Sequence, residues 1–542
     1  MSSYLWKVTA KRNVGKWPAG TSVEIVKQNT TAQPNANEIT VAFANLFLSM
    51  SFSRLRAVLL GILFLISNIS FQTAAQNATW ADNGAYSITW YNKNQNTFDI
   101  STPQELAGIA YLVNNNFADF SGKTINIISD IDLAGKNWVP IGLRSSIFKG
   151  NIEGNNHTID NIKINSGTSG APYAAGFCIY MQNSRISNLN FRGTLNVNNK
   201  YLGFIAYKAT SSNFENISIS CSLTFSHSVS TSTSFEYSSS ISGMITEATN
   251  CTFSDIRVTD NISYTFGDAR GRSCYGKISL YAGGIVAKSS NSTFTKCHAI
   301  NQFIATINGY SASNYYTSPG DSFITYGGIV GSLSGNSSKV VGCLVENILF
   351  EGRHPVGNYD TKRFQFGGVV GYMSKYDTST LKNCVALNDS YNIYGHDYSW
   401  VASWYHTNSH FGGVACQVPK NFAGCYSNNN VSKTISKCLD NSTMEDGSTS
   451  FSKNQMCTQS FVDELNFYSQ LEFDEDYWEL KDGKLCIKQK NINSGIDHIE
   501  IELPDTYIYT VQGVYVGNSM DNLTPGIYIV RTPKTSSKIV VR

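Results

Sequence analysis

Gly327-Gly328-Ile329-Val330-Gly331 is one copy of a phrase that returns along the chain at a regular interval. The other copies are Gly283-Gly284-Ile285-Val286, Gly367-Gly368-Val369-Val370-Gly371 and Gly412-Gly413-Val414-Ala415, with weaker versions at Gly203-Phe204-Ile205 and Ser242-Gly243-Met244-Ile245. The aligned glycines lie at positions 203, 243, 284, 328, 368 and 413, so the step is 40 to 45 residues. A repeat of this length indicates one supersecondary unit that stacks on its neighbours.

The repeated unit has the pattern of β-strands. After the glycines, each copy has β-branched residues, a polar turn such as 334–338, and an alternating segment such as 339–345. This pattern favours strands over helix. Short strands that recur at a fixed step stack best as parallel coils, in which like residues form ladders. We therefore predict an all-β protein whose residues 121–440 form a right-handed parallel β-helix, with loops on one face for binding.

Cysteine follows each strong copy 12 to 16 residues after its second glycine. The residues concerned are Cys297, Cys343, Cys384 and Cys425, and Cys251 has the same alternating setting. Their apolar neighbours indicate an inward face, where stacked free thiols fit a narrow core. No C-x-x-C pair occurs, which argues against a metal site. Disulfides between neighbouring coils stay open for an exported protein, since sequence does not give connectivity.

The start of the chain combines two segments of different character. Residues 1–49 have a β-β-α pattern and form an extension of doubtful origin. Residues 50–76 contain Arg54 and Arg56, the apolar run 57–66 and small residues near 73–75, which is the pattern of a secretory signal peptide. The alternative is a buried strand or helix of a larger N-terminal domain.

Residues 77–120 are expected to form an N-terminal cap. Thr102, Pro103 and the apolar spacing from Leu106 to Val113 predict an amphipathic helix. Such a helix would cover the open edge of the first coil, which would otherwise invite aggregation.

Several phrases resemble a known family. The series "DIDL…W.PIG…FKG…GN.HTI..I.I" over Asp130–Ile164, together with the Gly-Gly-Ile-Val-Gly phrases, resembles GLUG-repeat bacterial surface proteins of the pectin-lyase-like type. The turn at Glu153-Gly154-Asn155-Asn156-His157 departs from that family's usual Asp-Gly-x-Gly-His. The resemblance spans about residues 100–490, including exit coils over 441–495, and implies an exported β-helix, often an adhesin or passenger domain. It implies no reaction.

The tail, residues 496–542, predicts a small antiparallel β-sandwich from strands near 507–514, 523–530 and 538–542. It resembles the C-terminal sorting domain of the type IX secretion pathway of Bacteroidetes. With the signal peptide, this resemblance implies export to the cell surface or the medium, with the export machinery as a partner. The alternative is a plain β-sandwich cap with no sorting role.

Bulk composition narrows the possible partners. The 542 residues carry a net charge of +2, which is too small to attract nucleic acid or an anionic membrane electrostatically. Charged residues make up 15% and aromatic residues 12%, so the surface is rich in neutral polar groups and rings. Such surfaces suit carbohydrates. Extracellular solubility alone explains the asparagine and serine content equally well.

A histidine- and aromatic-rich loop, 391–410, is the predicted ligand site. Its candidate residues are Tyr394, His396, Tyr398, Trp400, Trp404, Tyr405 and His406. Amphipathic rings at this density either pack on the β-helix wall or form a platform that stacks sugars. A zinc site from His396, His406 and His410 is a third interpretation, although the spacing matches no common zinc site.

Enzymatic activity has little support in the sequence. Acidic residues are sparse between 203 and 440, and none recurs at the repeat step as paired carboxylates would. Asp268, Arg270 and Arg272 share one loop, which is a weak lyase-like cluster. No catalytic residue, cofactor or metal is therefore assigned, and the enzyme question stays open.

Taken together, these patterns predict a secreted or cell-surface protein that binds glycans or a host or neighbouring-cell surface, as adhesins do. The alternative is a polysaccharide lyase or glycoside hydrolase of the β-helix type. A binder should show an aromatic ledge with few charges, whereas an enzyme should show acidic or basic side chains converging in one cleft.

Overall fold

The computed structural model describes the greater part of the chain. The described residues are 3–9, 22–28, 30, 32–42, 78–143, 146–165, 173–228, 235–267, 276–308, 323–354, 363–373, 378–395, 410–417, 419–428, 432–435, 448–488, 507–510, 515–517, 526–531 and 536–541. They divide into two compact units, Met1–Lys488 and Gln489–Arg542, and each is described by itself. The apolar run of the predicted signal peptide lies outside the described residues. Within them, no helix has the length and apolar character that a membrane span requires.

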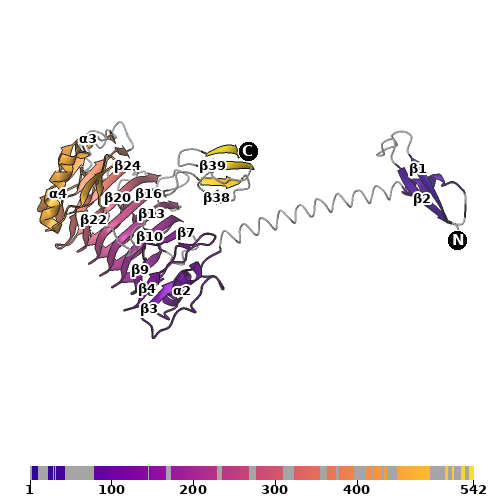
Figure 1. The fold of residues 1–542 in the computed structure, drawn as a ribbon, viewed down its shortest axis with the longest axis horizontal. Helices are drawn as coiled ribbons and strands as arrows, with labels where there is room; N and C mark the ends of the chain where they lie inside the picture. Colours follow the sequence, from indigo (N-terminus) through magenta and orange to yellow (C-terminus); the bar gives the residue numbers. More distant parts are fainter. Residues whose placement is uncertain are drawn as a thin grey trace. The chain divides into compact units, whose positions relative to one another are not determined.

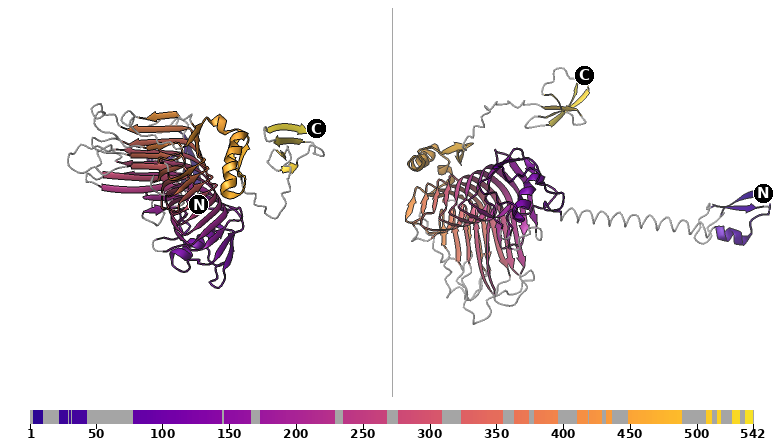
Figure 2. Two further views of the ribbon diagram at one scale, coloured as in Figure 1. Left: turned by 90° about the vertical axis from the view of Figure 1, so that its left-hand side faces the viewer. Right: turned by 90° about the horizontal axis from the view of Figure 1, so that it is seen from below.

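The larger unit contains a solenoid of parallel strands, which confirms the predicted parallel β-helix (Figure 1). Its largest wall, wall 1, consists of β3 (Thr97–Ile100), β4 (Thr124–Ile127), β5 (Ile131–Asp132), β6 (Asn151–Glu153), β7 (Thr158–Asn165), β10 (Arg185–Val197), β13 (Asn213–Ser228), β16 (Thr252–Gly267), β19 (Thr293–Thr295), β20 (His298–Asn308), β23 (Lys339–Val341), β24 (Leu344–His354), β27 (Thr380–Lys382), β28 (Val385–Asn388), β29 (Ser390–Gly395), β31 (Asn421–Ala423), β32 (Tyr426–Asn428), β33 (Ser432–Ile435) and β34 (Thr449–Phe451). The long strands of this wall lie side by side in both further views (Figure 2).

Two further parallel sheets accompany wall 1 between residues 174 and 412. Wall 2 consists of β8 (Ala174–Ala175), β11 (Tyr201–Gly203), β14 (Phe235–Ser242), β17 (Gly276–Gly283), β21 (Phe323–Gly327), β25 (Arg363–Gly367) and β30 (His410–Gly412). Wall 3 consists of β9 (Cys178–Gln182), β12 (Ala206–Thr210), β15 (Ile245–Thr249), β18 (Val286–Ser290), β22 (Val330–Ser334) and β26 (Val370–Met373). Like residues stack across coils, as in the ladder Phe214, Phe253 and Phe294 of wall 1. Their ring centroids are 5.1 and 4.5 Å apart.

The Gly-Gly phrases form the corner between wall 2 and wall 3. Strand β21 ends at Gly327, and β22 begins at Val330. A Cβ atom on Gly328 would lie 2.3 Å from the carbonyl oxygen of Gly368 in the next coil. Glycine is therefore required here because the next coil's backbone occupies the space of a side chain.

Two other bends recur as ladders of residues with positive φ. The bend that leads from wall 3 to wall 1 has Asn183, Ser211, Asn250, Asn291 and Gly335 at the equivalent position, with φ between 49° and 89°. A second bend, inside wall 1, has Asn188, Asn216, Asp255, Lys296, Gly342, Asn383 and Gly424, with φ between 49° and 66°. Asparagine and glycine predominate because they enter this region of φ at the lowest cost.

The repeated cysteines lie inside the solenoid, as predicted. Cys297, Cys343, Cys384 and Cys425 are buried free thiols, and each donates to the backbone carbonyl two residues before it. Cys251 is buried too, but it belongs to a neighbouring ladder, where the backbone N–H of Cys251 donates to the Ser292 hydroxyl. The structure has no disulfide among these five residues.

The solenoid begins beside the predicted helix, α2 (Pro103–Asn114). Thr102 and Glu105 form a capping box at its N-terminus, and Pro103 occupies its first turn. Its buried face, including Leu106, Ile109 and Val113, belongs to the same apolar core as the first strands of wall 1. The helix itself is confirmed, whereas its role as a cover for the coil edge stays a prediction.

Of the segment 441–495, expected to form exit coils, the structure describes 448–488. Strand β34 continues wall 1 by pairing with β32, and it is followed by α3 (Lys453–Met456), α4 (Gln459–Phe473) and the antiparallel hairpin β35 (Trp478–Lys481) and β36 (Lys484–Ile487). These elements pack on outward-facing side chains of wall 1, including Leu344, Val385 and Tyr426. An apolar stripe on the outside of the last coils is thereby removed from water.

The remaining elements lie near the two ends of the chain. Strands β1 (Ser3–Thr9) and β2 (Ser22–Gln28) form an antiparallel pair, and residues 36–42 are helical. The smaller unit contains one four-stranded antiparallel sheet, formed by β37 (Tyr507–Thr510), β38 (Tyr515–Gly517), β39 (Gly526–Arg531) and β40 (Ser536–Val541). The tail is thus antiparallel β-structure, and a second sandwich layer is not present among the described residues.

Candidate functional site

Most of the predicted loop site lies outside the described residues. His396, Tyr398, Trp400, Trp404, Tyr405 and His406 all belong to 396–409, for which no placement is described. Tyr394 lies in the last part of β29, and His410 begins β30 in wall 2. Tyr391, at the start of the loop, is buried and packs edge-on against Phe366 inside the solenoid. That one ring is therefore part of the core.

A cluster of four tyrosines lies where the early coils turn from wall 2 to wall 3. We call Tyr173, Tyr180, Tyr201 and Tyr207 the tyrosine patch. Tyr207 contacts the other three rings, at centroid distances of 6.1, 5.7 and 4.6 Å to Tyr173, Tyr180 and Tyr201, and it is stacked on Tyr201. The hydroxyls of Tyr173 and Tyr180 are 2.6 Å apart. All four side chains are partly exposed.

The shape of the corner explains why the later coils have no ring at the position of Tyr207. The ladder positions equivalent to Tyr207 in later coils hold Thr246, Ala287, Gly331 and Gly371. A Cβ on Gly331 would lie 2.3 Å from the carbonyl oxygen of Ala282, so the outer angle between the walls is closed there. The early coils instead leave room for a ring in that angle.

A short row of charges continues from the tyrosine patch along wall 3. Lys208, Glu247 and Lys288 occupy one ladder position in successive coils. Glu247 lies 3.9 Å from the Lys208 ammonium and 3.8 Å from that of Lys288. The Lys288 ammonium also lies 4.1 Å from the centroid of the Tyr281 ring, which places a cation over an aromatic face.

The surroundings keep three phenols of the tyrosine patch protonated. Partial burial raises the pKa of Tyr180, and the hydrogen bond with Tyr173 adds to this effect. Burial and then the Glu247 carboxylate raise the pKa of both Tyr201 and Tyr207. The hydroxyls of these three residues are therefore neutral groups that can donate and accept next to exposed ring surface.

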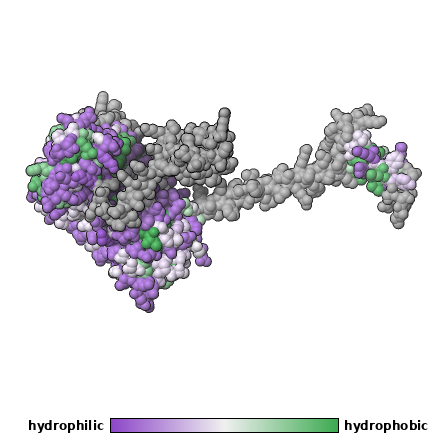
Figure 3. All heavy atoms as spheres, in the orientation of Figure 1, coloured by the Kyte–Doolittle hydropathy of each residue, from purple (hydrophilic) through white to green (hydrophobic). Residues whose placement is uncertain are grey.

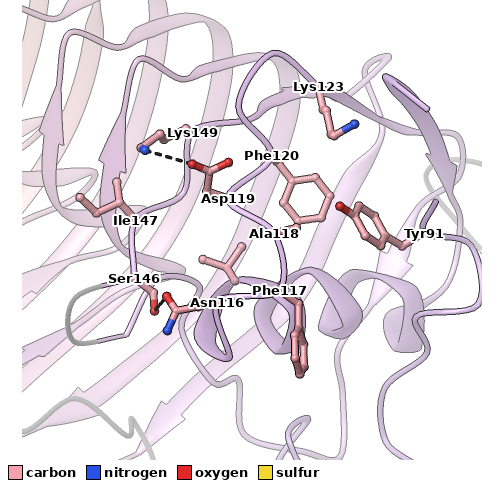
Figure 4. A pocket seen from close by; sticks show the side chains of 11 residues that line it. Tyr91, Asn116, Phe117, Ala118, Asp119, Phe120, Lys123, Ser146, Ile147 and Lys149 are labelled. Carbon is pink, nitrogen blue, oxygen red and sulfur yellow. Dashed lines mark hydrogen bonds and ion pairs between the residues drawn. The ribbon is translucent and has the colours of Figure 1, made fainter. Parts of the chain in front are cut away.

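A second feature is a pocket of about 500 Å³ beside the C-terminal end of α2 (Figure 4). Its lining consists of Tyr91, Val113, Asn116, Phe117, Ala118, Asp119, Phe120, Lys123, Ser146, Ile147 and Lys149. Phe120 has φ of 59°, which is unusual for an aromatic residue, and its ring is held by stacking near Trp90 and Tyr91. The Phe117 ring is 62% exposed at the rim.

The charges of this pocket already have partners within the protein. The Lys149 ammonium pairs with Asp119 at 3.0 Å. The Ser121 amide, and then Lys149, lowers the pKa of Asp119. Lys123 donates to the carbonyls of Lys93 and Gln95. The pocket therefore contains one carboxylate and two ammonium groups, and all three are already paired within the protein. It provides neither a pair of carboxylates nor a free base.

Two other kinds of candidate site are a lyase-like cluster and a metal site. Asp268, Arg270 and Arg272 lie outside the described residues. Among the residues that the structure describes, no three His, Cys, Asp or Glu side chains are grouped to hold a metal ion.

Comparisons with known proteins give little further information. No family model matches the sequence, and no curated protein matches it. A search of solved structures finds a chain titled "IgA1 Protease", with a TM-score of 0.29 and 13% identity over 60% of this chain. This chain covers 22% of that protein. We take the fold from the strand register and not from this similarity, and the GLUG and sorting-domain resemblances stay predictions.

Sequence reasoning missed the tyrosine patch, although a signal was present. Tyr201 pairs with Ala174, the residue after Tyr173, and Tyr180 pairs with Lys208, the residue after Tyr207. The tyrosines of the two early coils therefore lie one residue away from matching positions, 27 or 28 residues along the chain. This step is shorter than the 40 to 45 residues of the Gly-Gly repeats, so the alignment on glycine did not reveal it.

Proposed function

We propose that this chain is an exported β-helix protein that binds glycans of a polymer or cell surface through the tyrosine patch. The observation that supports this proposal is the contact of four partly exposed phenol rings in the angle between walls 2 and 3. Sugar rings stack on aromatic faces, and phenol hydroxyls bond to their polar edges. The composition, with few charges and many aromatic residues, favours the same class of ligand.

Binding is favoured over polysaccharide cleavage for a chemical reason. Glycoside hydrolysis requires two carboxyl groups that flank the scissile bond. The tyrosine patch has one carboxylate nearby, Glu247, and it lies between two lysines. The pocket beside α2 likewise has a single acid, Asp119, in an ion pair.

Segments that the structure describes only in part complete the proposal. The loop residues Tyr394, His396, Tyr398, Trp400, Trp404, Tyr405 and His406 are proposed as a second contact for the same ligand. Residues 50–76 are proposed to direct export and 496–542 to engage the export machinery, which would place the protein in the medium or at the outer surface. The surface of the face shown in Figure 3 is largely hydrophilic with small apolar areas, which suits such a location.

The test is a glycan array and polysaccharide pull-down with the full chain, its Tyr180→Ala/Tyr207→Ala variant and its Trp400→Ala/Trp404→Ala variant. Loss of two stacking rings should weaken binding by about tenfold or more. The Tyr86→Ala/Tyr111→Ala variant is the matched control, because it removes a stacked tyrosine pair with a 4.1 Å centroid distance at another place.

Each outcome discriminates between the alternatives. Binding that only the patch variant loses, without product, supports a binder that uses the tyrosine patch. Binding that only the tryptophan variant loses would move the site to the loop. Shortened or unsaturated sugar products would overturn the proposal in favour of the enzyme.

A further inference from the structure

A ladder of buried amides runs through the solenoid beside the Gly-Gly corners. Asn301, Asn347 and Asn388 are paired in register on β20, β24 and β28, and all are fully buried. Each donates from Nδ2 to the carbonyl of a Gly-Gly phrase in the next coil, at Gly328, Gly368 and Gly413, with distances of 3.0 to 3.1 Å. The ladder thus links each coil to the corner of the next.

The side chains of this ladder also bond to one another in one direction. Asn301 Nδ2 donates to Asn347 Oδ1 at 3.1 Å, and Asn347 Nδ2 donates to Asn388 Oδ1 at 2.7 Å. Every amide therefore donates towards the next coil and accepts from the previous one. Asn301 is the exception, because its Oδ1 is buried without a hydrogen-bond partner.

The residue that precedes Asn301 in the ladder is an acid. Asp260, on β16, is in register with Asn301 and is 5% exposed. Both of its carboxyl oxygens are buried and neither has a well-formed hydrogen bond, although the Gln302 N–H lies close enough to act on the pKa of the carboxyl group. An added Cβ on Gly243 would lie 2.8 Å from Asp260 Oδ2 and 2.3 Å from the Gly284 carbonyl oxygen, so this carboxyl group lies beside the Gly-Gly corner.

An ionised carboxylate does not fit this position. It has only acceptors, and it would lie in an apolar interior opposite the unpaired Asn301 Oδ1. A neutral carboxylic acid has one O–H donor, and a donor is what the ladder requires here. We propose that Asp260 is a neutral carboxylic acid in the folded protein and that its O–H donates a hydrogen bond to Asn301 Oδ1. The solenoid core then contains a hydrogen bond that exists only while Asp260 is protonated.

The electrostatic surroundings agree with this geometry. Burial raises the pKa of Asp260 well above its usual range, and the Gln302 amide opposes that shift only in part. The titratable groups that face Asp260 are Cys221 on β13 and Tyr326 on β21, and burial raises the pKa of both. Both of these neighbours are neutral when protonated, so neither supplies a positive charge that would stabilise a carboxylate.

The consequence for stability follows from proton linkage. An unfolded aspartate ionises near pH 3.9, whereas folded Asp260 keeps its proton to a higher pH. Between these two values the folded state binds one proton more than the unfolded state at this site. The contribution of Asp260 to stability is therefore fully present below the unfolded pKa and is lost as pH rises through the folded pKa.

Infrared spectroscopy of the full-length protein tests the protonation directly. The wild-type protein at pH 7 should show the carbonyl stretch of a buried neutral carboxylic acid, and Asp260→Asn should lack that band. A matched control is Asp255→Asn on the same strand, because Asp255 lies at a bend and is half-buried. The control should keep the band. A wild-type spectrum without this band would overturn the proposal, even where the variant does not fold.

The pH dependence of unfolding provides the second measurement. Asparagine occupies this ladder position in three later coils, so Asp260→Asn should fold and continue the Nδ2 to Oδ1 chain. From pH 5 to 7, the folded-to-unfolded ratio of the wild type should fall relative to the variant by about tenfold for each pH unit. Parallel pH profiles for wild type and Asp260→Asn would contradict a neutral Asp260, and Asp255→Asn should follow the wild type.

Discussion

Single residues decide where each coil bends. The positive-φ positions repeat from coil to coil, and their occupants are mostly asparagine and glycine. Asn216 also connects two coils, because its Nδ2 donates to Asn188 Oδ1 of the previous coil at 2.9 Å. The bend ladder is thus held by backbone preference and by side-chain bonds together.

Replacement of Asn216 separates these two contributions. Asn216→Ala should lower the free energy of unfolding by about 1–2 kcal/mol, because the Cβ of alanine clashes with the backbone in the left-handed conformation. Asn216→Gly should lose less, because glycine adopts that φ freely. Urea unfolding measures both. Equal losses in the two variants would assign the whole effect to the hydrogen bond with Asn188.

The buried cysteines of the solenoid should be inert in the folded protein. Burial raises the pKa of Cys178 and Cys343 above the usual range, whereas Cys457 is only partly buried. Thiol alkylation followed by mass spectrometry should label Cys457 before Cys178 and Cys343, which should react only after denaturation. Labelling of Cys343 in the native state at the rate of Cys457 would contradict the buried stack.

At the level of elements, α4 shows how an outer face of the solenoid is completed. Val462 and Leu465 are buried against wall 1, whereas Leu471 of the same helix is 69% exposed. Asn383 strengthens the contact because its Nδ2 donates to the Leu465 carbonyl and to the Tyr477 hydroxyl. The helix therefore belongs to the packed unit.

A pair of leucine substitutions in α4 tests this packing. Leu465→Ala should lower the free energy of unfolding by about 2–5 kcal/mol, because it leaves a cavity. Leu471→Ala should change it by less than about 0.5 kcal/mol, because its side chain is in solvent. Thermal unfolding of both variants is the measurement, and similar losses would mean that α4 does not pack as described.

Across the whole molecule, each coil contacts mainly its two neighbours. Strand β16 lies between β13 and β20 in wall 1, whereas β3 and β34 each pair with one strand at the two ends of that wall. Such an array opens from its ends, because terminal coils lose only one interface.

Hydrogen exchange should therefore depend on the position of a strand along the solenoid. Amides of β13, β16 and β20 should exchange most slowly, and those of β3 and β34 faster. Mass spectrometry of peptides from each strand measures this gradient. Uniform protection from β3 to β34 would mean that the solenoid opens as one cooperative unit.

The sequence by itself determined the strand repeat, the parallel stacking, the buried cysteines and the helix over 103–114. These depend on local periodicity and on glycine, whose spacing is visible in one dimension. It indicated a sugar-binding surface through composition but placed the site in 391–410, where Tyr391 proved to be part of the core. The tyrosine patch was missed because it forms between coils with a step of 27 or 28 residues, shorter than that of the Gly-Gly repeats.

Only the tertiary structure decided which side chains meet across coils. Asp260 has no special sequence context, and its meaning comes from its register with Asn301 and the oxygens around it. The helices of 453–473 likewise depend on an apolar stripe that exists only once the last coils are stacked. Contacts of this kind join residues that are far apart in the chain, so a local sequence pattern does not reveal them. They become visible only when the strand register and the burial of each side chain are known.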